Sequence, residues 1–533
     1  MKRYQKVLLG ILTAIIILIG GIQIYFSFFM DAQLKQTIIS RFQESAGNTF
    51  TLTINDLDLE LLGRGINISG VTLSSKKQEY QSELQSTIED IHIRGINFWQ
   101  LFIHQNIKLK EIRIVNPDIS LTGTSSSTSS TFNRENIRNQ LSKIDLLQQL
   151  SIPKFSITGL SFNYTHKDEQ SSPTLSFRDS DIHLYDISFD STFFSEDKII
   201  PAQHLTTDLR DLQYQTADGV YKLSTHQIAF SSMDSSMSIR SLQLQPRFSK
   251  ATFPKQFNHE VDRIRIKVDQ IYWSGIDSHK LNSKQQLSVQ DILIRNPDFD
   301  IYRDKRPPFP PNNNPPLPQE VIQGIPFPIT VDRITLSDGR IRYSEQIPQA
   351  QKAGYLLFTN LTGIFNNLSN IEKEWHDKSP SLQVKTDVMD SAELNASFRF
   401  PMDSKQQYIS GHLSAMPMKP LNKALTPLAF TRIDKGQILG MDFNMTLSPN
   451  KAKGAMTFTY ENLKISLLNK GEGQQNFGNT MKSFLANTFK VKTQNKGDDP
   501  RKGTIKFDRD TNKSVFNYWW KSLLSGLKSS IGI

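Results

Sequence analysis

The chain of 533 residues has no cysteine, and this absence excludes disulfides, thiolate chemistry and cysteine zinc sites. It agrees with an oxidising compartment, where a free thiol is a liability. Histidine is scarce: the ten histidines are scattered, without HExxH and without a pair at metal-ligand spacing. His92 and His183 fall inside strand patterns, where a solvent-facing histidine is more common than a ligand. We therefore expect no metal site.

Sequence motifs of catalysis are missing as well. The acidic stretch 55–58 lacks the central glycine and final glutamate of a calcium loop. Gly471, Gly473 and Gly478 do not follow a strand with phosphate-loop spacing. No GxSxG, SxxK or Walker sequence stands in a catalytic context. The sequence predicts no catalytic residue and no cofactor, with one alternative left open: a glycosidase whose paired carboxylates come from distant strands.

Long hydrophobic runs are absent with one exception, residues 7–30, which contain no charged residue. A helix of this length crosses a hydrocarbon core of about 30 Å. Basic residues precede it and Asp31 follows, which predicts a cytoplasmic stub at 1–6, a transmembrane helix at 7–30 and a body outside the cytoplasm. A cleaved signal peptide is the alternative. The apolar side chains of the predicted anchor are Val7, Leu8, Ile15, Ile16, Ile17, Ile24 and Phe26.

Positive charge is concentrated at the C-terminal end. The whole chain carries a net charge of +10, and residues 451–533 contain 15 basic and 6 acidic residues, a net charge of +9. Such a segment is attracted to anionic surfaces such as phospholipid head groups, lipopolysaccharide or nucleic acid. The predicted anchor argues against nucleic acid, so membrane lipids are the expected partners.

Most of the chain alternates apolar and polar residues with a period of two, which predicts strands. The pattern occurs twice. Gly95 and Pro117 in one copy match Gly275 and Pro297 in the other, at the same spacing of 22 residues. Flanking apolar residues keep fixed offsets over both copies. We expect a connecting helix at 31–49, a first β repeat at 50–220, a second at 221–370 and a further β region at 371–470.

Two segments interrupt this pattern. Residues 123–131 are a Ser/Thr run typical of a flexible loop, and a helical pattern follows at 136–150. In the second copy, residues 303–319 are dense in proline and asparagine and exclude a strand or helix interior. This proline-rich segment is either a rigid recognition arm or a loop across a sheet edge, and we favour the loop.

The basic tail, 471–533, contains a predicted helix at 475–489 and an amphipathic helix at 514–533. Adjacent tryptophans beside lysines suit the membrane–water interface, because the indole ring is half apolar and its N–H remains hydrated. The alternative is a terminal helix that lies on the sheet as a lid. The predicted membrane-interface residues are Phe516, Trp519, Trp520, Lys521, Leu523, Leu527 and Lys528.

After the anchor, residues 52–62 and 65–73 resemble the start of AsmA-family proteins, and the stretch 109–121, ending in Asn-Pro-Asp-Ile-Ser-Leu, is similar to their repeating strands. The resemblance covers the first 120 residues well and the second copy moderately. The proline-rich segment and the Trp-Trp tail are outside it. It implies a Gram-negative inner-membrane protein with a single-pass anchor, a cytoplasmic N-terminus and a periplasmic body that supports outer-membrane biogenesis.

The expected fold is therefore mainly β with a few helices: a transmembrane helix followed by a long, curved, repeat-built antiparallel sheet with an open groove or half-barrel. A sheet that alternates apolar and polar residues has one apolar face, which acyl chains could cover. The resemblance implies lipid transport along such a groove. The alternative is a structural scaffold or assembly factor whose apolar residues are sealed in a closed core, with envelope proteins as partners.

Overall fold

The computed structural model describes the chain in segments. The described residues are 30–44, 50–60, 63–75, 83–96, 109–124, 151–167, 174–188, 193, 198–310, 313–374, 378–468 and 491–532. They are mainly β, as predicted. The chain divides into two compact units, one comprising 1–219, 223–237 and 282–284, the other 220–222, 238–281 and 285–533.

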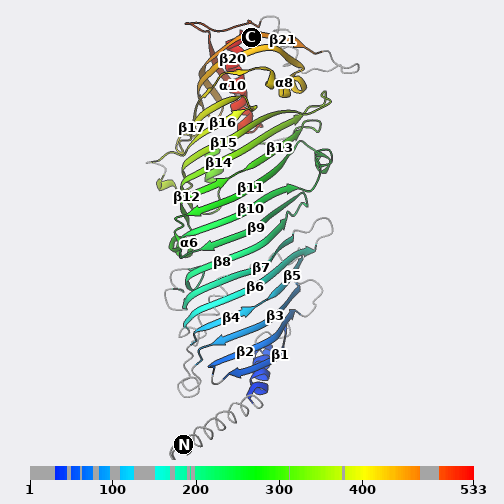
Figure 1. The fold of residues 1–533 in the computed structure, drawn as a ribbon, viewed down its shortest axis with the longest axis vertical. Helices are drawn as coiled ribbons and strands as arrows, with labels where there is room; N and C mark the ends of the chain where they lie inside the picture. Colours follow the sequence, from blue (N-terminus) through cyan, green and yellow to red (C-terminus); the bar gives the residue numbers. More distant parts are fainter. Residues whose placement is uncertain are drawn as a thin grey trace, which may run out of the picture. The chain divides into compact units, whose positions relative to one another are not determined.

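The first unit contains most of strands β1 to β9 (Figure 1). Their bounds are β1 Phe50–Glu60, β2 Gly65–Ser75, β3 Glu83–Arg94, β4 Glu111–Val115, β5 Asp118–Thr124, β6 Ser151–Lys167, β7 Thr174–Ser188, β8 Ala202–Gln215 and β9 Tyr221–Ser231. Neighbours β1, β2 and β3 pair antiparallel, as do β6, β7 and β8. Because successive side chains point to opposite faces, the alternating sequence gives each strand one apolar side.

A helix at residues 30–44 lies on the apolar side of β1 and β2. Its residues Leu34, Ile38 and Ile39 pack against a buried cluster, and Asp31 accepts a hydrogen bond from the Leu59 amide at 3.1 Å. The buried cluster consists of Ile54, Leu57, Leu59, Ile68 and Val71. The helical spacing of the connecting segment therefore serves a packing contact with the first hairpin.

The second unit holds most of β10 to β22 (Figure 1). The strands are β10 Ser236–Pro246, β11 Asp262–Ser274, β12 Leu287–Arg295, β13 Asp298–Asp304, β14 Ile329–Gln346, β15 Gly354–Ser369, β16 Ser381–Val388, β17 Ala392–Arg399, β18 Gln407–Leu413, β19 Met416–Pro417, β20 Thr431–Leu447, β21 Lys451–Leu467 and β22 Lys502–Asp508. The helices are η2 Phe253–Gln256, α6 Ser278–Lys284, α7 Pro318–Gln323, η3 Glu372–Glu374, η4 Lys419–Leu421, α8 Asn422–Ala429 and α10 Val515–Ile531. Helix α6 crosses the division between the units.

The repeated Asn-Pro-Asp sequence splits a strand in both copies. Asn116 and Asn296 have left-handed φ values of 47° and 50°, a conformation that asparagine tolerates better than most residues. The proline that follows has no N–H for the ladder, so the strand breaks into β4 and β5, and equally into β12 and β13. Each asparagine side chain bonds to a carboxylate, Glu89 at 2.6 Å and Asp269 at 2.8 Å.

These split strands correct one part of the predicted fold class. β4 and β5 pair antiparallel with β3 but parallel with β6, and β12 and β13 pair antiparallel with β11 but parallel with β14. The sheet is mixed rather than antiparallel throughout. A parallel neighbour requires a long connection, and the chain provides one between β5 and β6 and one between β13 and β14.

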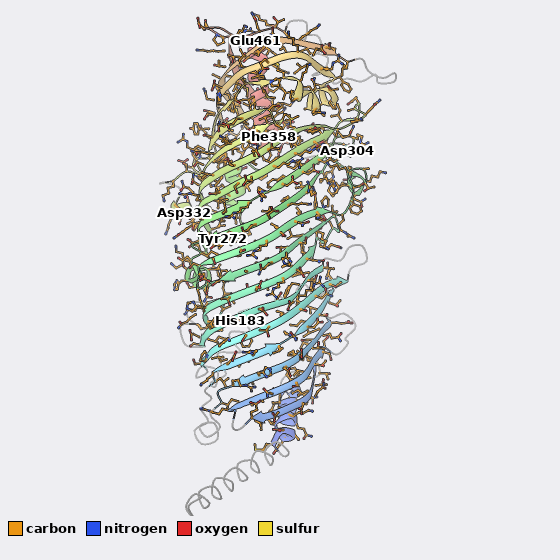
Figure 2. The ribbon with its side chains drawn as sticks, in the orientation of Figure 1. His183, Tyr272, Asp304, Asp332, Phe358 and Glu461 are labelled. Atoms are coloured by element: carbon orange, nitrogen blue, oxygen red, sulfur yellow. The ribbon has the colours of Figure 1, made fainter. Side chains whose placement is uncertain are left out.

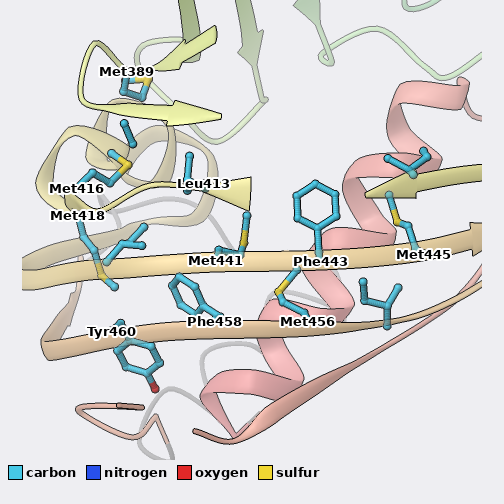
Figure 3. Packing of buried hydrophobic residues seen from close by; sticks show 14 of the residues in the cluster. Met389, Leu413, Met416, Met418, Met441, Phe443, Met445, Met456, Phe458 and Tyr460 are labelled. Atoms are coloured by element: carbon cyan, nitrogen blue, oxygen red, sulfur yellow. The ribbon is translucent and has the colours of Figure 1, made fainter. Parts of the chain in front are cut away.

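The largest hydrophobic core lies in the second unit, between strands β17 to β22 and helix α10 (Figure 3). It is rich in methionine, whose unbranched side chain fills irregular gaps. Tyr460, Met456, Ile505 and Tyr518 are each at most 1% exposed. Along α10, Ser522, Gly526 and Ser530 are buried, and a Cβ on Gly526 would lie 2.7 Å from Ile505 Cγ1. Small residues thus let the helix approach β22 closely.

Several predicted elements lie outside the described residues: the cytoplasmic stub, the anchor at 7–30 except Met30, most of the Ser/Thr run, and the helices at 136–150 and 475–489. Among the helices that the structure describes, none is long and apolar enough to cross a membrane. The seven anchor residues, Val7 to Phe26, are in the part that is not described.

Candidate functional site

The second unit carries a set of apolar rows on one face of β11, β13 and β14. Ile264 is in register with Ile301, and Ile301 with Tyr343. In the next row Ile266 is in register with Phe299, and Phe299 with Ile341. We call these two rows the open apolar rows: Ile264, Ile266, Phe299, Ile301, Ile341 and Tyr343.

All six side chains of the open apolar rows are half-buried, and none belongs to a core cluster of the described residues. The main contacts of the described helices α7, α8 and α10 are with β15 and β20 to β22. Apolar side chains inside a packed sandwich are normally buried, because partner atoms surround them on every side. The open apolar rows therefore keep part of their hydrocarbon surface accessible.

The first unit has an equivalent arrangement on β6 and β7. Phe162 and Phe177 are in register and stack with ring centroids 5.3 Å apart. Phe155, Ile157 and Leu184 on the same face are also half-buried. Phe155 and Leu184 pack against a small buried cluster of Ile152, Ile187 and Ala202, and Leu160 on β6 is buried as well. Each unit thus carries half-buried apolar rows on strands other than those that its helix covers.

Helix α10 divides the predicted membrane-interface residues between two environments. Trp519 packs against Phe398 at a ring distance of 5.1 Å, and its Nε1 donates to Gln407 Oε1 at 2.7 Å. Leu523 and Leu527 also pack against the large core. In contrast, Phe516 and Trp520 are 71% and 47% exposed. One face of α10 therefore makes the contacts of a lid, and the interfacial interpretation remains a prediction for Phe516 and Trp520.

At one edge, the apolar face of β13 and β14 becomes charged. Arg303 follows Ile301 on the same side of β13 and forms a two-bond ion pair with Asp262 on β11. Glu345 follows Tyr343 on β14, accepts a hydrogen bond from its hydroxyl at 2.6 Å, and pairs with Lys305 at 2.7 Å. Sequence analysis missed these residues, although the period of two continues through them.

The electrostatics of this charged edge follow from partial burial. Burial, followed by the neighbouring Glu345 carboxylate, raises the pKa of Tyr343, so the hydroxyl stays protonated. Burial alone would lower the pKa of Arg303, but the ion pair with Asp262 outweighs it and the net pKa is raised. Arg303 is therefore charged at neutral pH, and the charged edge adjoins the apolar rows directly.

The proline-rich segment packs against another part of the second unit. Leu317 is 1% exposed, and the Gln319 amide donates to the Gln406 carbonyl at 2.8 Å. Arg509 donates to the Pro315 carbonyl at 2.9 Å, and Lys405 pairs with Glu320 at 2.9 Å. The segment between β13 and β14 is thus held against the β17–β18 turn and the loop after β22.

The two strand histidines that the sequence singled out differ in their surroundings. His92 Nδ1 lies 2.8 Å from Asn67 Oδ1 on the neighbouring strand. His183 lies on β7 (Figure 2), where its ring centroid is 6.4 Å from that of Tyr185 and its buried Nδ1 has no hydrogen-bond partner among the described residues. In the described part of the chain, no three His, Asp or Glu side chains are grouped closely enough to hold a metal ion. A shallow hollow crosses β14 to β21, and its outward-pointing side chains are mostly Ser, Thr, Asn and Gln.

A scan against family models matches none, and a search of curated proteins finds no significant match. The geometry of the site therefore carries the functional argument.

Proposed function

We propose that this chain binds lipid acyl chains on the apolar faces of its strands, as an AsmA-like protein of the Gram-negative envelope. In this proposal residues 7–30 anchor it in the inner membrane with the N-terminus cytoplasmic and the body periplasmic. It supports outer-membrane biogenesis by binding or conveying phospholipid or lipopolysaccharide. It is not an enzyme.

The observation that supports lipid binding is the partial exposure of the open apolar rows. Burial of apolar surface provides about 25 cal/mol per Å², or about 0.8 kcal/mol for each buried methylene. A dozen methylenes on such a surface would contribute about 10 kcal/mol before the costs of binding. Single exposed apolar residues are ordinary on protein surfaces, but a contiguous apolar patch such as these two rows is typical of a binding surface.

A test of lipid binding uses the purified full chain, extracted after detergent exchange and examined for phospholipid by mass spectrometry. Replacing Phe299 and Ile341 with Asp places two charges on one open row and should abolish the bound phospholipid. Gln290→Asp with Thr335→Asp adds the same charge on the outward side of β12 and β14 and should leave it unchanged. Wild-type protein without lipid, or equal loss in both variants, would contradict the proposal.

The scaffold alternative has its own support in the large core under α10. There the apolar residues of β17 to β22 contact one another and the helix, as a closed β core requires. If that region governs function, the chain would bind envelope proteins and carry no lipid. Copurification of a stoichiometric protein partner with a lipid-free chain would favour this second function.

A further inference from the structure

The shallow hollow across β14 to β21 lies on the side of these strands that faces away from the large core. Its volume of about 920 Å³ is in the range of ligand sites in proteins. A row of polar side chains crosses it, each in register with the next on the neighbouring strand. We call this the central row: Gln383 on β16, Ser397 on β17, Ser410 on β18 and Asn444 on β20.

The side chains of the central row are exposed, and none of them has a hydrogen-bond partner among the described residues. Two amides and two hydroxyls offer donors and acceptors together. Neighbouring strands are about 4.8 Å apart, so the row presents these groups over a length of about 14 Å. The central row is therefore an extended strip of hydrogen-bonding groups that a ligand can reach.

The row on one side of this strip is occupied by contacts within the protein. His412 Nδ1 lies 2.7 Å from Asp442 Oδ1, and Lys385 pairs with Glu393 at 2.8 Å. The Asn395 amide donates to the same glutamate at 2.9 Å. These contacts hold the flanking side chains against one another, which leaves the central row as the available polar surface of the hollow.

The row on the other side contributes an aromatic ring. It lines an adjoining hollow of about 400 Å³, and the central row borders both hollows. Tyr408 is half-buried there, and its hydroxyl donates to Gln406 Oε1 at 2.7 Å. The Arg399 guanidinium lies over the Tyr408 ring, 4.4 Å from its centroid. A fixed, planar side chain with an apolar body thus stands beside free amides and hydroxyls.

We propose that this hollow binds a neutral oligosaccharide. Sugar hydroxyls both donate and accept hydrogen bonds, so they match amide and hydroxyl side chains, and the hydrocarbon face of a sugar ring packs on aromatic rings. The central row has no ionisable and no apolar side chain, so it offers no charge to a phosphate and no hydrocarbon surface to an acyl chain. The site is separate from the open apolar rows and goes beyond the proposed function.

The test is calorimetric titration of the purified full chain with cellohexaose and chitohexaose, two neutral oligosaccharides long enough to span the central row. Wild-type protein should bind one molecule of at least one of them, with a Kd of about 0.1 mM or below. Gln383→Ala with Asn444→Ala should weaken this binding about tenfold, because two hydrogen-bonding groups are lost. Gln85→Ala with Asn163→Ala makes the same changes at exposed positions of β3 and β6 in the first unit and should leave the affinity unchanged.

Absence of binding by both sugars would overturn the proposal, and so would an equal loss of affinity in the two double variants. Hexagalacturonate, an anionic oligosaccharide, should bind no more tightly than the neutral sugars, and tighter binding would refute the neutral class. If Gln383→Ala with Asn444→Ala unfolds early, each single variant should weaken binding about threefold. Phe299→Asp with Ile341→Asp, which tests lipid binding, should keep the sugar affinity, so each proposal can fail without the other.

Discussion

Within the second unit, the region under α10 and the open apolar rows have the same alternating sequence but opposite degrees of coverage. Ile505 on β22 is 1% exposed beneath Gly526 of the helix. Ile301 on β13 carries the same side chain at an equivalent alternating position and is half-buried. Alternation therefore determines which side of a strand is apolar, and neighbouring elements determine whether that side is covered.

The largest expected effect comes from a matched pair of substitutions at these isoleucines. Ile505→Ala leaves a cavity in a packed core and should lower the free energy of unfolding by about 3 kcal/mol. Ile301→Ala should cost less than about 1 kcal/mol, because its surroundings are only partly packed. Denaturant unfolding of the full chain measures both. Equal costs would mean that β13 is covered as completely as β22.

The two adjacent tryptophans of α10 provide a second comparison. Trp519→Ser removes the ring contact with Phe398 and the hydrogen bond to Gln407, and should destabilise the second unit by about 2 kcal/mol. Trp520→Ser alters an exposed ring and should change stability by less than about 0.5 kcal/mol.

Vesicle binding then separates the lid from the interfacial interpretation of α10. Trp520→Ser should weaken binding of the full chain to anionic vesicles if the exposed face meets a membrane. Unchanged binding would leave α10 with the role of a lid alone.

The repeated strand break offers a test of whether the two copies are equivalent. Asn116→Ala and Asn296→Ala should each destabilise by about 1 kcal/mol, because alanine is disfavoured at a positive φ and loses the bond to Glu89 or Asp269. Replacement with glycine should cost less. Thermal unfolding of the four variants checks this, and a large difference between the copies would show that the break serves different purposes in them.

The smallest effect concerns pH and Lys521. Its pKa in the folded protein is below 10.5, chiefly because of burial, so the unfolded chain binds more protons between the two pKa values. Stability should therefore rise as the pH increases through the folded pKa toward 10.5. Lys521→Met and Lys521→Arg should both reduce this rise in denaturant unfolding. An unchanged rise would assign it to another group.

The copies also differ at the charged edge. By the same offsets that align the repeats, Gly123 and His166 stand where the second copy has Arg303 and Glu345. A Cβ on Gly123 would lie 2.9 Å from the Tyr164 hydroxyl, so the first copy has little room for a long basic side chain there. The pair Arg303 and Glu345 is therefore particular to the second copy.

Much of the fold could be predicted from the sequence because it depends on local rules. A period of two predicted the mainly β fold, and the repeated Gly and Asn-Pro-Asp spacing predicted two related β segments. The parallel pairing of β6 with β4 and β5, and of β14 with β12 and β13, was not predicted. Strand direction depends on which strands meet, and alternation is identical for parallel and antiparallel neighbours.

The sequence by itself determined the apolar side of each strand, the broken strands and the amphipathic character of the last helix, because each follows from residues near one another in the chain. Tertiary structure alone decided that α10 covers β21 and β22, and that the rows on β13 and β14 stay half-buried. Those outcomes depend on contacts between residues far apart in sequence, for which no local pattern carries a signal.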